Sequence, residues 1–172
     1  MQSVVRKEND NNGGELSLTV YDLYRDIFRL SGFDGTPEDL SKLHYVHCVS
    51  ADLAMGAGIA VEFDKRYHIK DALNHVWPDR PRIVNWPSCF RVGPVYNIVT
   101  KERYFHKPTY DSMQAGLIKL RQLVEKDGTE YLAMPKIGCG LDKLKWEKVR
   151  PMILNTFSGY PITIYICSNA EE

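Results

Sequence analysis

Two glycine-rich segments, each placed between a predicted strand and a predicted helix, constrain the fold of this chain most. MGAGIA (55–60) follows the apolar run 44–50, and IGCGLD (137–142) follows the run 130–134. In open α/β sheets, ligands bind at the carboxyl ends of the strands, where such loops lie. Glycine lets backbone N–H groups approach a ligand, and a helix N-terminus favours an anion. Each segment alone could be an ordinary tight turn, but together they predict a site for two phosphates, such as a pyrophosphate.

Strand-like and helix-like segments alternate along the chain, which predicts an α/β fold with helices on both faces of the sheet. We expect strands at 16–21, 44–50, 130–134 and 162–167, two strands within 89–101, and helices at 60–76, 109–128 and 145–157. Residues 31–40 are predicted to form a loop with a short helical turn near Pro37, and 77–87 a proline-bearing connection. Thr109 or Asp111 can cap the helix at 109–128, and Gly128 follows its end.

The chain of 172 residues is expected to form one domain, 15–172, after a polar, flexible tail at 1–14. Its formal net charge is zero, so nothing in its overall charge favours nucleic acid or membranes. It has no apolar run of about 18 residues and no signal-peptide core at its start. We therefore expect a monomer inside the cell, in the nucleus, the cytoplasm or both, with no membrane association.

The cysteines do not form a metal or redox motif. Cys48, Cys89, Cys139 and Cys167 are far apart in sequence, and no C-x-x-C pair is present. Inside a cell they are expected to be reduced thiols. The five histidines are scattered, so we predict no metal site and no cofactor.

Three residues near the glycine segments invite a chemical role. Asp142 could cap the next helix, act as a general acid or base, or contact a ribose hydroxyl. Lys101 ends a predicted strand; it could be an ordinary surface charge or, if partly buried, a nucleophile. For Cys139, packing is favoured over a nucleophilic role, because no histidine is placed in sequence to activate it.

Three stretches resemble the macrodomain family, and more narrowly its terminal ADP-ribose protein glycohydrolase branch: HCVSADLAMGAGIAVEF, VTKERYFHKPTY and MPKIGCGLDKLKWEKV. The resemblance extends from about 18 to 167. It implies a three-layer α/β/α macrodomain with a mixed, mostly parallel sheet. It also implies removal of mono-ADP-ribose from glutamate and aspartate side chains and deacylation of O-acyl-ADP-ribose. A reader module that binds ADP-ribose without cleaving it is the alternative, and a different nucleotide enzyme is a third, weaker possibility.

The resemblance also assigns roles to residues. It implies that Lys101 attacks the anomeric carbon of the ribose and that Asp142 assists turnover. Asp26, with Ile27 beside it, matches the aspartate that contacts the adenine amino group, and Ser50 matches a serine near the distal ribose. The other implied ADP-ribose contacts are Met55, Gly56, Ala57, Gly58 and Ile59 in the first glycine segment, and Pro135, Ile137, Gly138, Cys139, Gly140 and Leu141 in the second.

The chain departs from the wider family at two places. Many macrodomains carry Asn-Ala-Ala-Asn and a triple glycine where this chain has CVSAD and MGAGIA, which favours the lysine scheme over water activation. Arg25 stands where a glycine usually precedes the adenine-contacting aspartate.

The expected partners are ADP-ribose and mono-ADP-ribosylated proteins, with poly-ADP-ribose as a further candidate. The basic, aromatic segment 101–110 could touch RNA or poly-ADP-ribose, but a loop that covers the distal ribose is the favoured interpretation.

Overall fold

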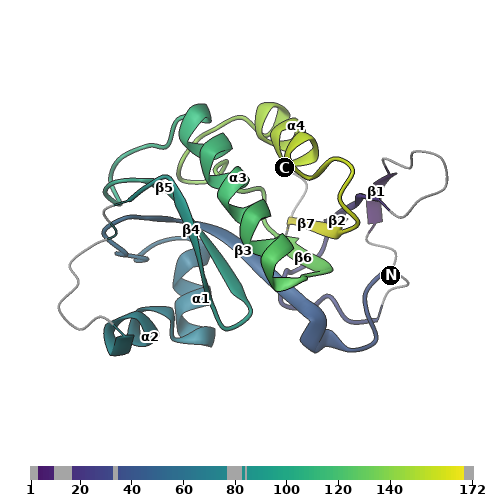
Figure 1. Ribbon diagram of the computed structural model, residues 1–172, viewed down its shortest axis with the longest axis horizontal. Helices are drawn as coiled ribbons and strands as arrows, with labels where there is room; N and C mark the ends of the chain where they lie inside the picture. The colour runs from purple at the N-terminus through teal and green to yellow at the C-terminus, as the bar shows by residue number, and fades with distance from the viewer. Residues whose placement is uncertain (1–3, 10–16, 33–34, 77–82, 84, 169–172) are drawn as a thin grey trace.

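The computed structural model describes residues 4–9, 17–32, 35–76, 83 and 85–168 (Figure 1). These residues form one seven-stranded sheet with helices on both of its faces. The elements are β1 (Val4–Asn9), β2 (Thr19–Tyr24), the 3₁₀ turn η1 (Leu40–Lys42), β3 (Leu43–Ser50), α1 (Ile59–Tyr67), α2 (Ile69–Val76), β4 (Ser88–Val92), β5 (Val95–Lys101), α3 (Tyr110–Asp127), β6 (Tyr131–Met134), α4 (Trp146–Phe157) and β7 (Thr163–Ser168).

The strand order is β1-β2-β7-β6-β3-β5-β4. The five inner strands pair in parallel, whereas β1 and β4 pair antiparallel at the two edges. This confirms the predicted α/β fold with a mixed, mostly parallel sheet. No helix among the described residues is long and apolar enough to cross a membrane.

The helices divide between the two faces of the sheet in a way that opens a crevice. In Figure 1, α3 and α4 cover one face, and α1 and α2 lie on the other. The chain therefore leaves β3 towards one face, and it leaves β5 and β6 towards the opposite face. The carboxyl ends of these neighbouring strands are consequently not covered by one continuous layer, and such a divergence of connections is where α/β sheets bind ligands.

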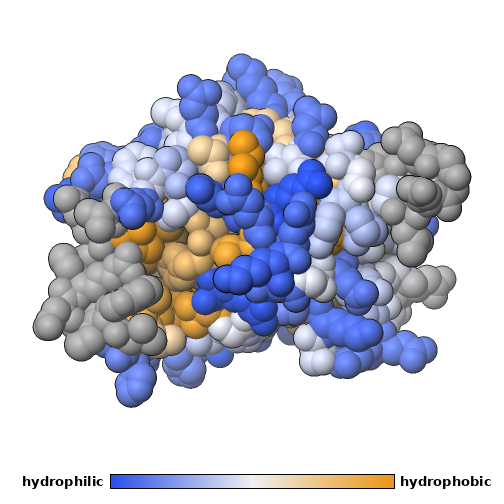
Figure 2. Space-filling model, in the orientation of Figure 1, coloured by the Kyte–Doolittle hydropathy of each residue, from blue (hydrophilic) through white to orange (hydrophobic). Residues whose placement is uncertain are grey.

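Two hydrophobic cores lie on the two faces of the sheet. Alternate residues of β3 reach them: Val46 belongs to the core that also contains α3 and α4 residues, whereas Val49 belongs to the core that contains Phe63 of α1. The surface is mostly hydrophilic on the face shown in Figure 2, with apolar surface gathered around the edge strand β4, between α3 and α2.

The structure corrects two predicted elements. Val4–Asn9 forms an edge strand where a flexible tail was predicted, because a polar edge strand can be held by charge: Arg150 of α4 lies 2.6 Å from Asp22 of β2 and 3.6 Å from Glu8 of β1. The predicted helix 60–76 is two helices, because His68 adopts a left-handed conformation, with φ of +52°, and ends α1.

The remaining strands and helices match their predictions to within a few residues. The first predicted strand is displaced, from 16–21 to β2 at Thr19–Tyr24. Residues 1–3 and 10–14 of the predicted tail, residue 16 and most of the predicted connection 77–87 lie outside the described residues. The extent of the domain, 15–172, stays a prediction.

Candidate active site

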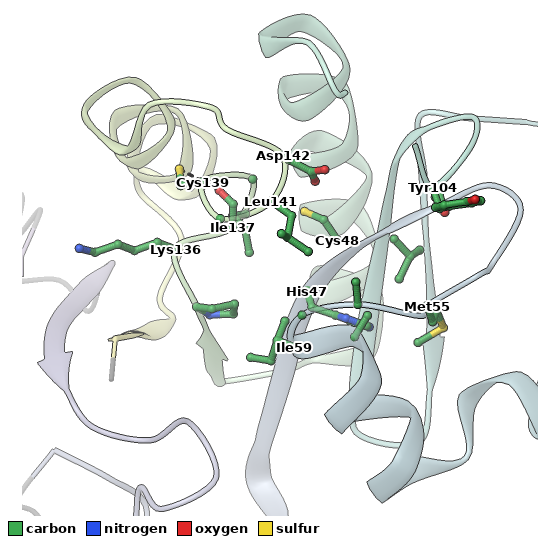
Figure 3. A pocket seen from close by; sticks show the side chains of 18 of the residues that line it. His47, Cys48, Met55, Ile59, Tyr104, Lys136, Ile137, Cys139, Leu141 and Asp142 are labelled. Carbon is green, nitrogen blue, oxygen red and sulfur yellow. Dashed lines mark hydrogen bonds between the residues drawn. The ribbon is translucent and has the colours of Figure 1, made fainter. Parts of the chain in front are cut away.

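A cavity of about 700 Å³ lies at the carboxyl ends of β3, β5 and β6 (Figure 3). Its walls come from segments that are far apart in the sequence: the two glycine loops, the ends of β3, β5 and β7, and the loop after β5. In Figure 3, His47 and Cys48 come from β3, Met55 and Ile59 from the first loop and the start of α1, and Ile137 to Asp142 from the second loop. Its volume is that of a site for a ligand of nucleotide size.

All but one of the predicted site residues line this cavity. The lining includes Lys101, Asp142, Ile27, Ser50, Met55, Gly56, Ala57, Gly58, Ile59, Pro135, Ile137, Gly138, Cys139, Gly140 and Leu141. The exception is Asp26, whose carboxylate accepts a hydrogen bond of 2.9 Å from the N–H of Phe28. It lies beside the lining residue Ile27 rather than among the residues of the wall.

Lys101 and Asp142 form an ion pair inside the cavity. The distance from Lys101 Nζ to Asp142 Oδ1 is 2.6 Å, and the two side chains are only 13% and 15% exposed. Lys101 ends β5, and Asp142 belongs to the loop after β6, with β3 between these two strands in the sheet. The cap of α4 is Lys145, so the interpretation of Asp142 as a helix cap is wrong.

The first glycine loop leads directly into a helix whose N-terminus is uncapped. Gly58 is the residue before α1, has φ of +63°, and is followed by no capping side chain. Gly58 and Ile59 line the cavity, so the first helical turn, which has no side-chain cap, begins at its wall. Among its N–H groups, that of Val61 already donates to the carbonyl of Gly58 at 3.3 Å. Leu53 and Met55 also adopt positive φ, of 56° and 47°, which is uncommon for residues with side chains.

The second glycine loop folds back on itself instead of entering a helix. The N–H of Cys139 donates to the carbonyl of Lys136 at 3.2 Å, and the N–H of Leu144 donates to the carbonyl of Gly138 at 2.8 Å. The helix α4 begins at Trp146, one residue from its predicted start, so three residues separate Asp142 from the helix N-terminus. The N–H of Cys139, which we expected to contact phosphate, is already used within the turn.

Asp52 ties the end of β3 to the loop after β5. Its carboxylate accepts hydrogen bonds from the hydroxyl of Ser50, from the N–H of Ala54 at 3.2 Å and from the N–H of Tyr104 at 3.0 Å. Partial burial acts to raise the pKa of Asp52, but these hydrogen bonds and the charge of Arg103 outweigh it and lower the pKa. Asp52 therefore stays ionised and holds the Ser50 hydroxyl in a fixed direction.

His47 and Cys48 form part of the cavity wall and were not predicted. His47 is fully buried, and its Nε2–H donates to Asn97 Oδ1 at 2.5 Å, because the Asn97 amide nitrogen donates to two backbone carbonyls. Burial lowers the pKa of His47 to about 4, so the ring is neutral at pH 7. Burial also raises the pKa of the Cys48 thiol, and the negative charge of Asp142 adds to this effect. Cys48 is consequently a neutral thiol and not a nucleophile.

The other unpredicted wall residues are Tyr104, Lys107, Lys136, Cys167 and Ser168, together with Val49, Ala54 and Ala60. Lys107 spans the mouth of the cavity, because its ammonium donates to the carbonyl of Leu141 at 2.5 Å. The basic, aromatic character of 101–110 was the sequence signal for this segment. No group of three or more His, Cys, Asp or Glu side chains within the described ranges is arranged to hold a metal ion.

Comparison with known proteins places this geometry in a family. No family model matches the chain. The human ADP-ribose glycohydrolase OARD1 is 40% identical over 122 residues, which cover 70% of this chain and 78% of that relative. Among solved structures, the macrodomain of Thermus aquaticus DarG superposes with a TM-score of 0.67 at 16% identity, covering 88% of this chain and 99% of that one. Thermosipho africanus DarTG in complex with ADP-ribose superposes with a TM-score of 0.63 at 16% identity, covering 98% of this chain and 45% of that one.

The fold, with its cavity at the strand carboxyl ends, is that of a macrodomain. By its likeness to OARD1, the chain belongs to the terminal ADP-ribose glycohydrolase branch of the macrodomains, which confirms the predicted resemblance.

Proposed function

We propose that this protein is an ADP-ribose glycohydrolase that removes mono-ADP-ribose from glutamate and aspartate side chains and deacylates O-acyl-ADP-ribose. The observation that carries the proposal is the ion pair of Lys101 and Asp142 in a cavity beside an uncapped helix N-terminus. Family membership supports the substrate class, because the human relative is named as an ADP-ribose glycohydrolase.

The cavity offers a different chemistry to each part of ADP-ribose. The pyrophosphate is proposed to lie at the start of α1, where Gly58 and the first helical N–H groups provide donors and a favourable field for an anion. The distal ribose then lies beside Lys101 and Asp142. Adenine lies towards Ile27, and Asp26 reaches its amino group with the carboxylate oxygen that is not bonded to Phe28.

The proposed reaction has two steps. In the first, Asp142 takes a proton from the Lys101 ammonium, and the free amine attacks the anomeric carbon of the distal ribose. A bond from Nζ to that carbon forms, the bond to the acyl oxygen breaks, and the carboxylate of the substrate leaves with the bonding electrons. In the second step, water adds at the same carbon. The amine leaves and takes back the proton that Asp142 holds, while the proton lost by the water goes to solvent; this gives free ADP-ribose and regenerates Lys101 and Asp142.

The proposed setting of the enzyme follows from the same chemistry. Its substrates are mono-ADP-ribosylated proteins, and the end of a poly-ADP-ribose chain is a further candidate ligand. The described residues contain no disulfide, which is consistent with a reducing compartment. We propose that the protein acts as a monomer inside the cell, in the nucleus, the cytoplasm or both.

The proposal is tested with a protein that carries mono-ADP-ribose on a glutamate. The wild type should release ADP-ribose, and Lys101→Ala should lower the rate by about a thousandfold or more, because the nucleophile is lost. Lys119→Ala is the matched control, since it removes an exposed lysine on α3 away from the cavity. Full activity in Lys101→Ala would overturn the mechanism.

The ion pair also supports a second candidate function, a reader that binds ADP-ribose without cleaving it. An ion pair of 2.6 Å inside the cavity can serve to bind and orient the ribose without any covalent step. For a reader, calorimetry would show binding of ADP-ribose by the wild type, and no ADP-ribose would be released from any linkage.

A further inference from the structure

The most exposed large hydrophobic side chains of the described residues gather at the mouth of the cavity. Tyr104 is 64% exposed, Phe105 62% and Leu141 61%, and the next most exposed, Ile118, is 47% exposed. Tyr104 and Leu141 line the cavity itself, and Phe105 packs on Tyr104 with ring centroids 5.3 Å apart. Figure 3 shows Tyr104 and Leu141 apart from one another, so these side chains form an apolar rim and not one continuous patch. Scattered exposed hydrophobic residues need no explanation, but several at the rim of one cavity are typical of an interaction surface.

This surface is held in place by the protein. The N–H of Tyr104 donates to Asp52 at 3.0 Å, and the N–H of His106 donates to the carbonyl of Arg103 at 3.0 Å. On the other side, Lys107 is bonded to the carbonyl of Leu141. The loop is thus fixed by hydrogen bonds to both walls of the cavity, and the aromatic rings that it carries stay exposed to solvent. A surface that is already ordered loses less conformational entropy when a partner binds.

The position of the surface identifies its occupant. Phe105 and Tyr104 follow closely after Lys101 in the chain, and Leu141 directly precedes Asp142. In the proposed reaction the acyl group leaves beside Lys101 and Asp142. The pyrophosphate and adenine extend in the opposite direction, towards α1 and Ile27. The polypeptide that carries the modified glutamate must therefore emerge where the exposed rings lie.

The charge of the segment fits the same occupant. Arg103 and Lys107 are exposed beside the rings. A polypeptide whose modified residue is a glutamate or aspartate in an acidic stretch would complement these cations, and such complementarity speeds association and selects partners.

We propose that Tyr104, Phe105 and Leu141 form the docking surface for the substrate polypeptide, and that they take an apolar side chain next to the ADP-ribosylated glutamate, with Arg103 and Lys107 facing its acidic residues. This inference rests on the proposed function for the direction in which the substrate leaves the cavity. It makes the loop after β5 a determinant of which modified proteins are bound.

The test compares two ligands that share ADP-ribose and differ in the polypeptide. Calorimetry in the Lys101→Ala background, where substrate is not consumed, measures the Kd of a mono-ADP-ribosylated glutamate peptide and of free ADP-ribose. The peptide should bind about tenfold more tightly than ADP-ribose, and adding Phe105→Ser should remove most of this advantage and change the Kd of ADP-ribose less than about twofold. Leu40→Ser, at another exposed hydrophobic residue that is not part of the cavity wall, is the control and should change neither Kd.

Three results would overturn the docking surface. One is equal affinity for peptide and ADP-ribose, and another is an equal loss of both in Phe105→Ser. The third is that Phe105→Ser weakens binding of an ADP-ribose oligomer but not of the peptide, which would make the rings a platform for adenine. The wild type is assayed in parallel for release of ADP-ribose from the same peptide. Differential binding without release would refute the proposed hydrolase and leave the docking surface intact.

Discussion

The loop after β3 and the loop after β6 flank the same cavity, but they are built differently. The first runs straight into α1, so what it presents to a ligand is backbone: glycines and the uncapped N–H groups of a helix. The second closes a turn of its own before α4 begins, and it delivers a side chain, Asp142, to Lys101. In the proposed function, these two glycine-rich segments, which look alike in sequence, have different roles: the first binds an anion and the second places a catalytic side chain.

The two loops also rest on different cores. The first lies on the α1 side, where the wall of the cavity contains the buried, neutral His47. The second rests on Met113 and Leu144. We therefore expect the free energy of unfolding to depend on pH through the first side of the cavity and on side-chain volume through the second loop.

The largest effect on stability is expected at Gly138 in the second loop. Its φ is +75°, and an added Cβ would lie 2.6 Å from Met113 Cε and 3.0 Å from Leu144 Cδ1. Gly138→Ala should therefore lower the free energy of unfolding by about 3 kcal/mol, from backbone strain and overpacking together. Gly140→Ala is the matched control, because no atom lies within 4 Å of its added Cβ, and it should change the free energy by less than about 0.5 kcal/mol. Urea unfolding measures both, and equal effects would mean that the second loop is not set by packing.

The next effect is a loss of stability in acid through His47. Its native pKa is about 4, against an ordinary value of 6.5. Between these pH values His47 binds a proton in the unfolded chain but not in the native state. Its contribution to the free energy of unfolding is therefore present above pH 6.5 and is lost as the pH falls towards 4. From pH 6.5 to pH 5 the loss from this group should be about 2 kcal/mol.

The contribution of His47 is isolated as a difference between variants. Burial lowers the pKa of His44 as well, so the pH dependence of stability in the wild type contains contributions from both histidines. His47→Gln keeps a polar side chain that does not titrate, and its free energy of unfolding should depend less steeply on pH over this interval. Parallel profiles for the wild type and His47→Gln would contradict the neutral, buried ring.

A smaller effect is expected at the tie between the first loop and the loop after β5. Asp52→Ala removes the acceptor of hydrogen bonds from Ser50, Ala54 and Tyr104, and should lower the free energy of unfolding by about 1 kcal/mol. Glu38→Ala removes an exposed carboxylate and should have no measurable effect. Thermal unfolding measures the stability of both variants. If Asp52→Ala were as stable as the wild type, the hydrogen bonds to Asp52 would not stabilise the loop.

The features that the sequence predicted well are those that depend on local signals. The helix at 109–128 has Thr109 as its cap, in a capping box with Ser112, and ends at Gly128 in the left-handed conformation. The two strands predicted within 89–101 are β4 and β5, and the hairpin turn at Gly93 separates them. Both patterns need only neighbouring residues, so an isolated sequence carries them in full.

The features that were missed depend on contacts between distant segments. The strand β1 is polar and is held by Arg150, which lies far along the chain. His47 is one of the five scattered histidines to which the sequence assigned no role, because nothing near it in sequence indicates that Asn97 is its partner. The pairing of Lys101 with Asp142 came from the resemblance to a family, since their strands are separated in the sheet by β3.

The central claim, that Lys101 is the nucleophile and Asp142 moves its proton, is tested most directly by intact-mass measurement of Asp142→Ala after exposure to the glutamate-linked substrate. Without Asp142 the second step should slow more than the first, so the account predicts a protein heavier by one ADP-ribosyl group, with the adduct on Lys101 and absent from the double variant Lys101→Arg, Asp142→Ala. Release of ADP-ribose by Asp142→Ala at the wild-type rate, or an adduct that persists in the double variant, would contradict it.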